Sequence, residues 1–198
     1  MKKTTKLLAA ATAGAGLWVA ALPAPSFAEE KPKAEPQIEV VGVSGSGCKK
    51  DTTQVVVDPN GGWVTAIYDT FTANTPPKPA LKACTLVLRV TTASGYRIGM
   101  RQAAFSGDAM LRPGGSAEFK AKYFWQGGSH TEERVGWQHD GSYEGSWSAT
   151  HELKDFWGSR CEGQDQLIIT QSLKAQGSGH NSVGMNYGTF WNFVTEAC

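Results

Sequence analysis

Histidine and serine are the residues in this 198-residue chain that would most readily carry metal or nucleophilic chemistry. The His151-Glu152 pair lacks a histidine three residues further on, so the zinc motif H-E-x-x-H is incomplete. Ser129 and His130 are adjacent in a glycine-rich stretch, but the nucleophile motif G-x-S-x-G is absent. His130 and His139 would approach each other across a hairpin, where exposed histidines are commoner than metal ligands. We therefore predict no metal site and no nucleophile.

Carboxylates offer the other route to catalysis, because glycosidases use two carboxyl groups at a fixed separation. Glu132 and Glu133 are neighbours, and neighbouring residues of a strand point to opposite faces of the sheet. Either of them would need Asp140 or Glu144 as its partner, and a solvated hairpin explains all four acids more simply. We predict no catalytic residue and no cofactor, with a small secreted hydrolase kept as an alternative.

Four cysteines stand in the chain without a C-x-x-C motif, which excludes the usual thioredoxin-like and paired-cysteine zinc sites. They are Cys48, Cys84, Cys161 and Cys198. Four cysteines allow three pairings. We favour Cys48–Cys84 with Cys161–Cys198, which keeps each bridge within one half of the chain. Each closed loop of about 37 residues would stabilise the fold by about 3 to 4 kcal/mol.

The N-terminus has the pattern of an export signal. Lys2, Lys3 and Lys6 precede an apolar run from Leu7 to Leu22, which is short for a membrane span. Small residues at Ser26 and Ala28 predict cleavage after Ala28, so residues 1–28 would be removed and the protein secreted; a retained anchor is the alternative. Nothing later in the sequence predicts a membrane span.

Cleavage would remove three lysines and no acidic residue. The number of basic residues would fall from 19 to 16, while the number of acidic residues would stay at 18. A nearly neutral surface without a basic block argues against nucleic acid as the partner.

Residues 29–37, EEKPKAEPQ, are rich in charge and proline and predict a flexible arm. Lys31, Lys33 and the following Ile38 are candidate contacts, since an extended arm joined to a strand suits docking on a partner. A spacer left by signal processing is the simpler alternative.

From Ile38 to Cys198 the apolar residues recur with a period of two, and glycine or proline turns separate the runs. Strands are expected at 38–43, 54–57, 63–71, 84–90, 96–105, 117–125, 167–170 and 187–194, with a short helix or a strand at 151–157. About nine strands without a helical stripe predict a single all-β domain, an antiparallel β-sandwich or Greek-key fold stapled by disulfides.

Six tryptophans follow the predicted signal, and two of them flank a polar stretch. Trp137 and Trp147, together with Tyr143 between them, are candidate binding residues, because aromatic side chains bury large areas in contact surfaces. They would equally stack on sugar rings, and the alternative is that they pack within a hairpin or the core. Trp63, Trp125 and Trp191 are expected to fill the core.

Several short motifs occur in a recognisable order along the chain. They are Gly45-Ser46-Gly47-Cys48, Asp69-Thr70-Phe71-Thr72-Ala73, Lys82-Ala83-Cys84-Thr85-Leu86, Gly95-Tyr96-Arg97-Ile98, Tyr123-Phe124-Trp125-Gln126-Gly127 and Trp157-Gly158-Ser159-Arg160-Cys161. Over about residues 38–174 the sequence resembles the secreted bacterial and fungal proteins of domain of unknown function 4360. The resemblance implies secretion, a β-rich domain and disulfides, and it carries no catalytic residue. The proline-rich segment before Cys84 and the final Cys198 depart from the family pattern.

These observations favour a secreted, non-enzymatic β-sandwich that binds an extracellular protein. A binder of cell-wall or extracellular polysaccharide is the first alternative.

We expect the secreted protein to begin at Glu29 and to have a mass four hydrogens below that of reduced residues 29–198. Intact-mass spectrometry with thiol alkylation measures both properties. Reduction should lower the free energy of unfolding by several kcal/mol, because two closed loops reopen. Two alkylated cysteines in the unreduced protein would contradict the two bridges, and an N-terminus at Met1 would contradict cleavage.

Overall fold

The computed structural model describes residues 35–76, 80–126, 132–161, 163–185 and 188–198. Residues 34–198 form one compact unit. The predicted signal, Lys31, Lys33, Ser129 and His130 lie outside the described residues.

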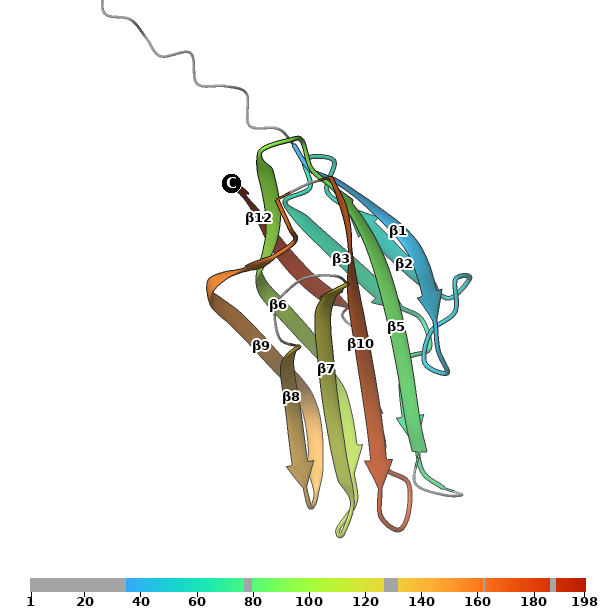
Figure 1. The fold of residues 1–198 in the computed structure, drawn as a ribbon. Helices are drawn as coiled ribbons and strands as arrows, with labels where there is room; N and C mark the ends of the chain where they lie inside the picture. The colour runs from blue at the N-terminus through green and yellow to red at the C-terminus, as the bar shows by residue number, and fades with distance from the viewer. Residues whose placement is uncertain (1–34, 77–79, 127–131, 162, 186–187) are drawn as a thin grey trace, which may run out of the picture. The chain divides into compact units, whose positions relative to one another are not determined.

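Two antiparallel sheets make up the described fold (Figure 1). Sheet A has the strand order β1 (Gln37–Ser44), β5 (Ala80–Thr91), β10 (Gln164–Gln176), β7 (Ser116–Gln126) and β8 (Glu133–Asp140). Sheet B has the order β2 (Thr53–Val57), β3 (Trp63–Tyr68), β12 (Thr189–Ala197), β6 (Tyr96–Leu111), β11 (Ser182–Gly184) and β4 (Thr72–Asn74), and β9 (Tyr143–Gly158) also pairs with β6. The predicted all-β sandwich is confirmed.

The long strand β6 organises sheet B, because both of its edges are hydrogen-bonded. One edge pairs first with β12 and then with β11, and the other edge pairs with β9 along almost its whole length. The hairpin turn at Gly141 joins β8 of sheet A to β9 of sheet B. The short turn between β6 and β7 likewise passes from sheet B to sheet A.

The predicted alternation of buried and exposed residues holds along the strands. In β10, for example, Leu167, Ile169, Gln171 and Leu173 are fully buried, while Ile168, Thr170 and Ser172 between them are partly exposed. Aromatic rings from both sheets meet in the core: Phe105 of β6 lies 4.9 Å from Phe119 of β7 and 6.1 Å from Trp191 of β12, between ring centroids. Burial of this apolar surface is the main stabilising term of the sandwich.

Two details differ from the sequence-based expectation. The described residues contain twelve strands rather than about nine, and the three-residue strands β4 and β11 are too short to give a periodic pattern. Of the two alternatives for residues 151–157, the strand is observed, within β9. Trp125 and Trp191 are buried in the core as expected, but Trp63 is half-buried on the outer face of sheet B because its neighbour Val64 takes the inward position.

The start of the fold also differs, because Pro36, assigned to the flexible arm, is buried. Its carbonyl oxygen lies 2.5 Å from where a Cβ on Gly61 would stand, and Gly61 has a positive φ of 68°. Only glycine permits both the left-handed turn and this close approach. Ile38, a candidate contact residue, lies in β1. It pairs with Val90 of β5 and packs half-buried against the core.

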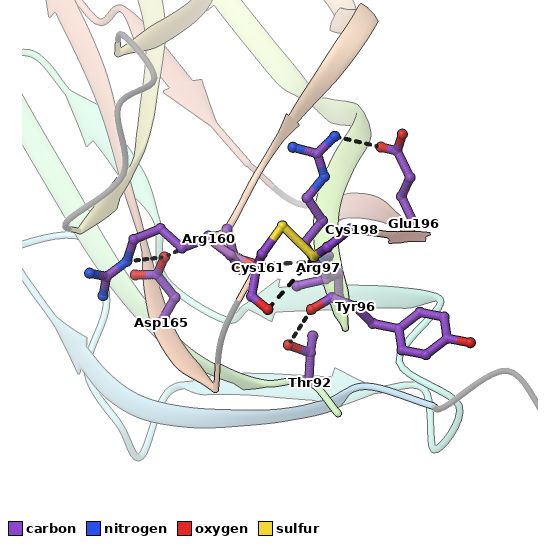
Figure 2. The surroundings of a disulfide bond; sticks show 10 residues. Thr92, Tyr96, Arg97, Arg160, Cys161, Asp165, Glu196 and Cys198 are labelled. Atoms are coloured by element: carbon purple, nitrogen blue, oxygen red, sulfur yellow. Dashed lines mark hydrogen bonds and ion pairs between the residues drawn. A yellow bond between two sulfur atoms is a disulfide. The ribbon is translucent and has the colours of Figure 1, made fainter. Parts of the chain in front are cut away.

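Both predicted disulfides are confirmed. Cys48 is bonded to Cys84, and Cys161 is bonded to Cys198. Figure 2 shows the second bridge beside the start of β6, where the Cys198 amide also donates a hydrogen bond to the Gly95 carbonyl at 2.9 Å. This bridge fastens the end of β12 to the connection between β9 and β10.

A buried polar contact also links the two sheets. Gln171 of β10 has no exposed surface, and its Nε2 donates to the hydroxyl of Tyr68 in β3 at 2.6 Å. Burial raises the pKa of Tyr68 to about 12, and the hydrogen bond from Gln171 only partly opposes this effect. The folded state therefore holds the phenol in its protonated form.

This raised pKa predicts a pH dependence of stability in the alkaline range. The contribution of Tyr68 is fully present below pH 10, the pKa of an unfolded tyrosine, and is lost as the pH rises to about 12. The loss should approach about 3 kcal/mol. Urea unfolding of the wild type and Tyr68→Phe across this range measures it, and the variant should have the shallower slope. Parallel curves for the two proteins would contradict the assignment.

Candidate binding cleft on sheet B

A break in the strand register shapes the outer face of sheet B around Arg101. Met100 pairs with Phe193 of β12 and Gln102 pairs with Asn192, so Arg101 has no partner on that edge. On the other edge, Met100 pairs with Trp157 and Gln102 with Glu152, and four residues of β9 stand opposite Arg101 alone. Such bulges bend a strand and redirect its side chains.

Two glycines make room for the excursion of β9. Gly99 and Gly158 face each other across β6 and β9, and a Cβ on either would come within 2.7 Å of the Phe156 ring. The guanidinium of Arg97 lies 4.2 Å from the centroid of that ring, a cation–π contact. Arg97 also bonds Glu196 of β12 at 3.3 Å (Figure 2), so it holds the bulge and the end of β12 together.

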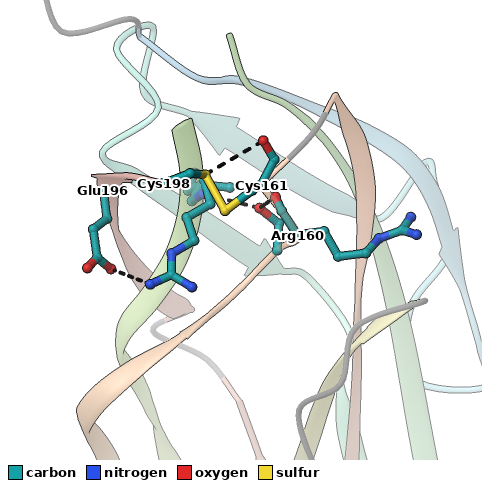
Figure 3. Close-up of polar contacts among 7 residues, drawn as sticks. Arg160, Cys161, Glu196 and Cys198 are labelled. Carbon is teal, nitrogen blue, oxygen red and sulfur yellow. Dashed lines mark hydrogen bonds and ion pairs between the residues drawn. A yellow bond between two sulfur atoms is a disulfide. The ribbon is translucent and has the colours of Figure 1, made fainter. Parts of the chain in front are cut away.

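The Cys161–Cys198 bridge supports the same corner. In the view of Figure 3, Glu196 and Arg160 extend to opposite sides of the bridge. Asp165 is almost fully buried and accepts hydrogen bonds from the backbone amides of Arg160 and Gln166 at 3.3 and 2.8 Å, which fixes the turn from β9 into β10. The disulfide and this turn thus position both strands that border the bulge.

Two adjoining cavities of about 250 and 470 Å³ open over the bulge, and we call them together the Arg101 cleft. They share Arg101, Leu153 and Lys154. The remaining lining residues are Met100, Gln102, Glu152, Asp155, Phe156, Asn192, Val194, Thr195 and Glu196. This lining combines amide, guanidinium, ammonium and carboxylate groups with apolar walls, a composition suited to a polar ligand that also has apolar faces.

A row of four side chains crosses the sheet, and three of them line the cleft. Trp63 pairs with Asn192, Asn192 with Gln102, and Gln102 with Glu152, so the row runs over β3, β12, β6 and β9. Directly paired residues lie on the same face, and three strand spacings give the row a length of about 14 Å. The half-buried Phe190 lies two residues from Asn192 on the same face. The face therefore has aromatic groups at one end and hydrogen-bonding groups at the other.

The charges around the cleft balance once Arg97 is included. Arg101 and Lys154 stand against Glu152, Asp155 and Glu196, and Glu196 is paired with Arg97 outside the lining. The five lining side chains are exposed. Among the described residues, no group of three or more histidine, cysteine or acidic side chains is placed to hold a metal ion. The cleft therefore favours hydrogen bonding to a neutral polar ligand over capture of a charged one.

The predicted hairpin residues are brought together, but they pack on one another. Trp147 is buried, and Trp137 stacks on it with ring centroids 5.4 Å apart. Tyr143 lies 5.7 Å from Trp137 and 4.5 Å from His139, and its hydroxyl donates to the Ser146 carbonyl. Trp137 and Tyr143 are half-buried against the core, so most of their ring surface is already covered within the hairpin.

The histidine considered for chemistry lies in a polar contact between the sheets. Nδ1 of His151 hydrogen-bonds the hydroxyl of Tyr123, and Nε2 lies 3.8 Å from Oε2 of Glu133. Burial raises the pKa of Tyr123, and the charge of Glu133 adds to the effect. Since Tyr123 has no exposed surface, its phenol is out of reach of a substrate, and the contact serves to join β7, β8 and β9.

The fold places this chain among disulfide-bonded β-sandwich domains. Residues 34–195 match the family described as "Domain of unknown function (DUF4360)", and the chain belongs to that family, as the sequence motifs indicated. A structure of TmCBM61 in complex with β-1,4-galactotriose is similar over 79% of this chain and 88% of that chain, with 14% identity and a TM-score of 0.34. A search of curated proteins gives no significant match. In the described residues, no helix has the length and apolarity needed to cross a membrane.

Sequence reasoning missed the cleft because its residues carry no motif. Arg101, Gln102, Glu152 and Asn192 come from three strands that are distant in sequence, and only the register brings them together. One local signal was present: Gly99 interrupts a strand pattern, and such a glycine often marks a bulge or a close approach of another group.

The packing of the hairpin predicts a stability effect for Trp137→Ala. Removing a ring that stacks on Trp147 should lower the free energy of unfolding by about 2 to 4 kcal/mol, somewhat less than for a fully buried aromatic. Thermal and urea unfolding measure the change. An unchanged melting temperature would instead indicate that Trp137 is free to act as a contact residue.

Proposed function

We propose that this protein is a secreted, non-catalytic binding module that holds an extracellular polysaccharide on the outer face of sheet B. The observation that carries the proposal is the row formed by Trp63, Asn192, Gln102 and Glu152 at the Arg101 cleft. Secretion follows from the predicted signal, and two disulfides agree with an oxidising compartment.

The chemistry of the row suits sugar rings. A pyranose presents C–H groups on its faces and hydroxyls around its rim, so it needs both an apolar platform and groups that donate and accept hydrogen bonds. Trp63 offers the platform at one end, and the amide of Gln102 offers donors and an acceptor. The Nδ2 of Asn192 donates to the Gly62 carbonyl at 3.3 Å, so Asn192 offers its amide oxygen and its second N–H. The row of about 14 Å is long enough for several sugar units rather than one.

The exposure of the acids supports a binding role over a catalytic one. A glycosidase acid needs a carboxyl group whose pKa is raised by an apolar environment. Glu152 and Asp155, the exposed acids over the bulge, lie in contact with solvent. A general acid of that kind is therefore not supported by their surroundings.

A protein partner, which the sequence favoured, is the second candidate. Val56 of β2 and Ile67 of β3 are 37% and 40% exposed on the same face as Trp63. Such apolar side chains beside an aromatic residue suit a protein contact. The hairpin aromatics lend it less support, because they are largely covered by one another.

Isothermal titration with soluble neutral polysaccharides, preceded by a glycan array, tests the proposal. Trp63→Ala and Gln102→Ala should each weaken binding at least tenfold, about 1.4 kcal/mol, while both variants remain folded at the assay temperature. Phe124→Ala is the matched control, because this half-buried aromatic lies on the outer face of sheet A. Equal loss in the control, or no glycan bound at all, would contradict the proposal. In the second case, a secreted protein that co-purifies through Trp63 would support the protein partner.

A further inference from the structure

The outer face of sheet A carries a second hollow, on the opposite side of the sandwich from the Arg101 cleft. A cavity of about 450 Å³ lies over β7 and β8 and is lined by Lys120, Ala121, Lys122, Arg134, Val135 and Gly136. Lys120 pairs with Gly136, and Lys122 pairs with Arg134. Because Gly136 has no side chain, the space between the long cationic side chains stays open.

The charge of this hollow is one-sided. Its described lining has three cations and no carboxylate. The three side chains are well exposed, at 57% for Lys120, 44% for Lys122 and 69% for Arg134, so they can turn towards a ligand. An anion entering the hollow would meet donors from two adjacent strands.

Two glutamates hold the cations from outside the hollow. Glu132 accepts from Arg134 at 2.7 Å and lies 3.5 Å from Nζ of Lys122, while Glu118 pairs with Lys120. The hydrogen bond from Arg134, with the charge of Lys122, lowers the pKa of Glu132, so this carboxylate stays ionised in the neutral range. Exposed pairs of this kind contribute little to stability, and an incoming anion can compete for the same cations.

The hollow continues along the sheet towards β10. A second cavity of about 290 Å³ shares Lys120 with the first and is lined further by Ser116, Glu118, Gln138, Lys174 and Gln176, together with Ala117. Lys174, Glu118 and Gln138 form a cross-strand row over β10, β7 and β8. The two cavities thus present cations first, and then amide and hydroxyl groups with a further lysine and with Glu118, whose carboxylate is paired with Lys120.

We propose that this groove over β7, β8 and β10 binds an acidic polysaccharide through the oxyanion groups on its successive units. The cations match carboxylate, sulfate or phosphate groups, and the amides and hydroxyl of the second cavity match the sugar hydroxyls between them. The open and solvent-exposed cations give each anion only a weak contact, so affinity comes from several units bound at once. The groove is independent of the neutral-polysaccharide face on sheet B.

Binding to polygalacturonate oligomers of increasing length, followed by titration at low and high salt, tests this site. Affinity should rise with oligomer length and fall with salt, because exposed charges are screened. Inorganic phosphate and a neutral glucan are the comparison ligands. Competition by millimolar phosphate as effective as that by the oligomer, or equal binding of the neutral glucan, would overturn the assignment.

Single substitutions test whether the acidic polysaccharide binds in the groove over β7, β8 and β10. Lys122→Gln and Arg134→Gln should each weaken oligomer binding about fivefold, the loss expected for one cation at an anionic surface. Glu132→Gln should strengthen it, because the competing carboxylate is removed. Lys49→Gln and Lys50→Gln make the same charge change at exposed positions before β2 and should have no effect. Equal losses in these controls, or weaker binding by Glu132→Gln, would overturn the assignment of acidic-polysaccharide binding to this groove.

Trp63→Ala should leave polygalacturonate binding intact. This variant therefore separates a failure of the groove on sheet A from a failure of the proposed site on sheet B.

Discussion

The pairing of β6 on both of its edges is the constraint on which the rest of the structure depends. A strand bonded on both sides has little freedom to slide, because a shift of one residue would turn its buried side chains outward. Phe105 and Ile98 of β6 are fixed in the core by this register. The slip at Arg101 is therefore confined to one position, and it is there that the outer surface departs from a regular sheet.

The same register explains why the two outer faces differ. Residues that lie opposite each other across several strands share a face, so each face collects side chains from distant parts of the sequence. On sheet B this brings Trp63, Asn192 and Gln102 into one row. On sheet A it brings Lys122 and Arg134 together. The core needs only apolar residues at alternate positions, which leaves the outward positions open to specialisation.

This difference also sets the limit of prediction from the sequence. The period of two predicted the β-sandwich, and the spacing of the cysteines led to the disulfide pairs that the structure confirms. Neither pattern tells which face a tryptophan takes when it stands next to another apolar residue. Trp63 was expected in the core, but the inward position went to Val64. Likewise, no local pattern indicates that four residues of β9 will stand opposite Arg101, because that mismatch depends on pairing between distant strands.

The disulfide Cys161–Cys198 makes the order of one wall of the cleft depend on an oxidising environment. The end of β12 pairs only with β6 beyond the bulge, and its last residues are exposed, so few apolar contacts would hold it there alone. Thr195 and Glu196 nevertheless line the cleft, and Glu196 is the partner of Arg97, which in turn lies against Phe156. A covalent bond at Cys198 restricts the freedom of this strand end and so keeps the Arg97 contacts in place. Because such a bond persists in oxidising surroundings, this wall of the cleft is best ordered where the predicted export signal would deliver the protein.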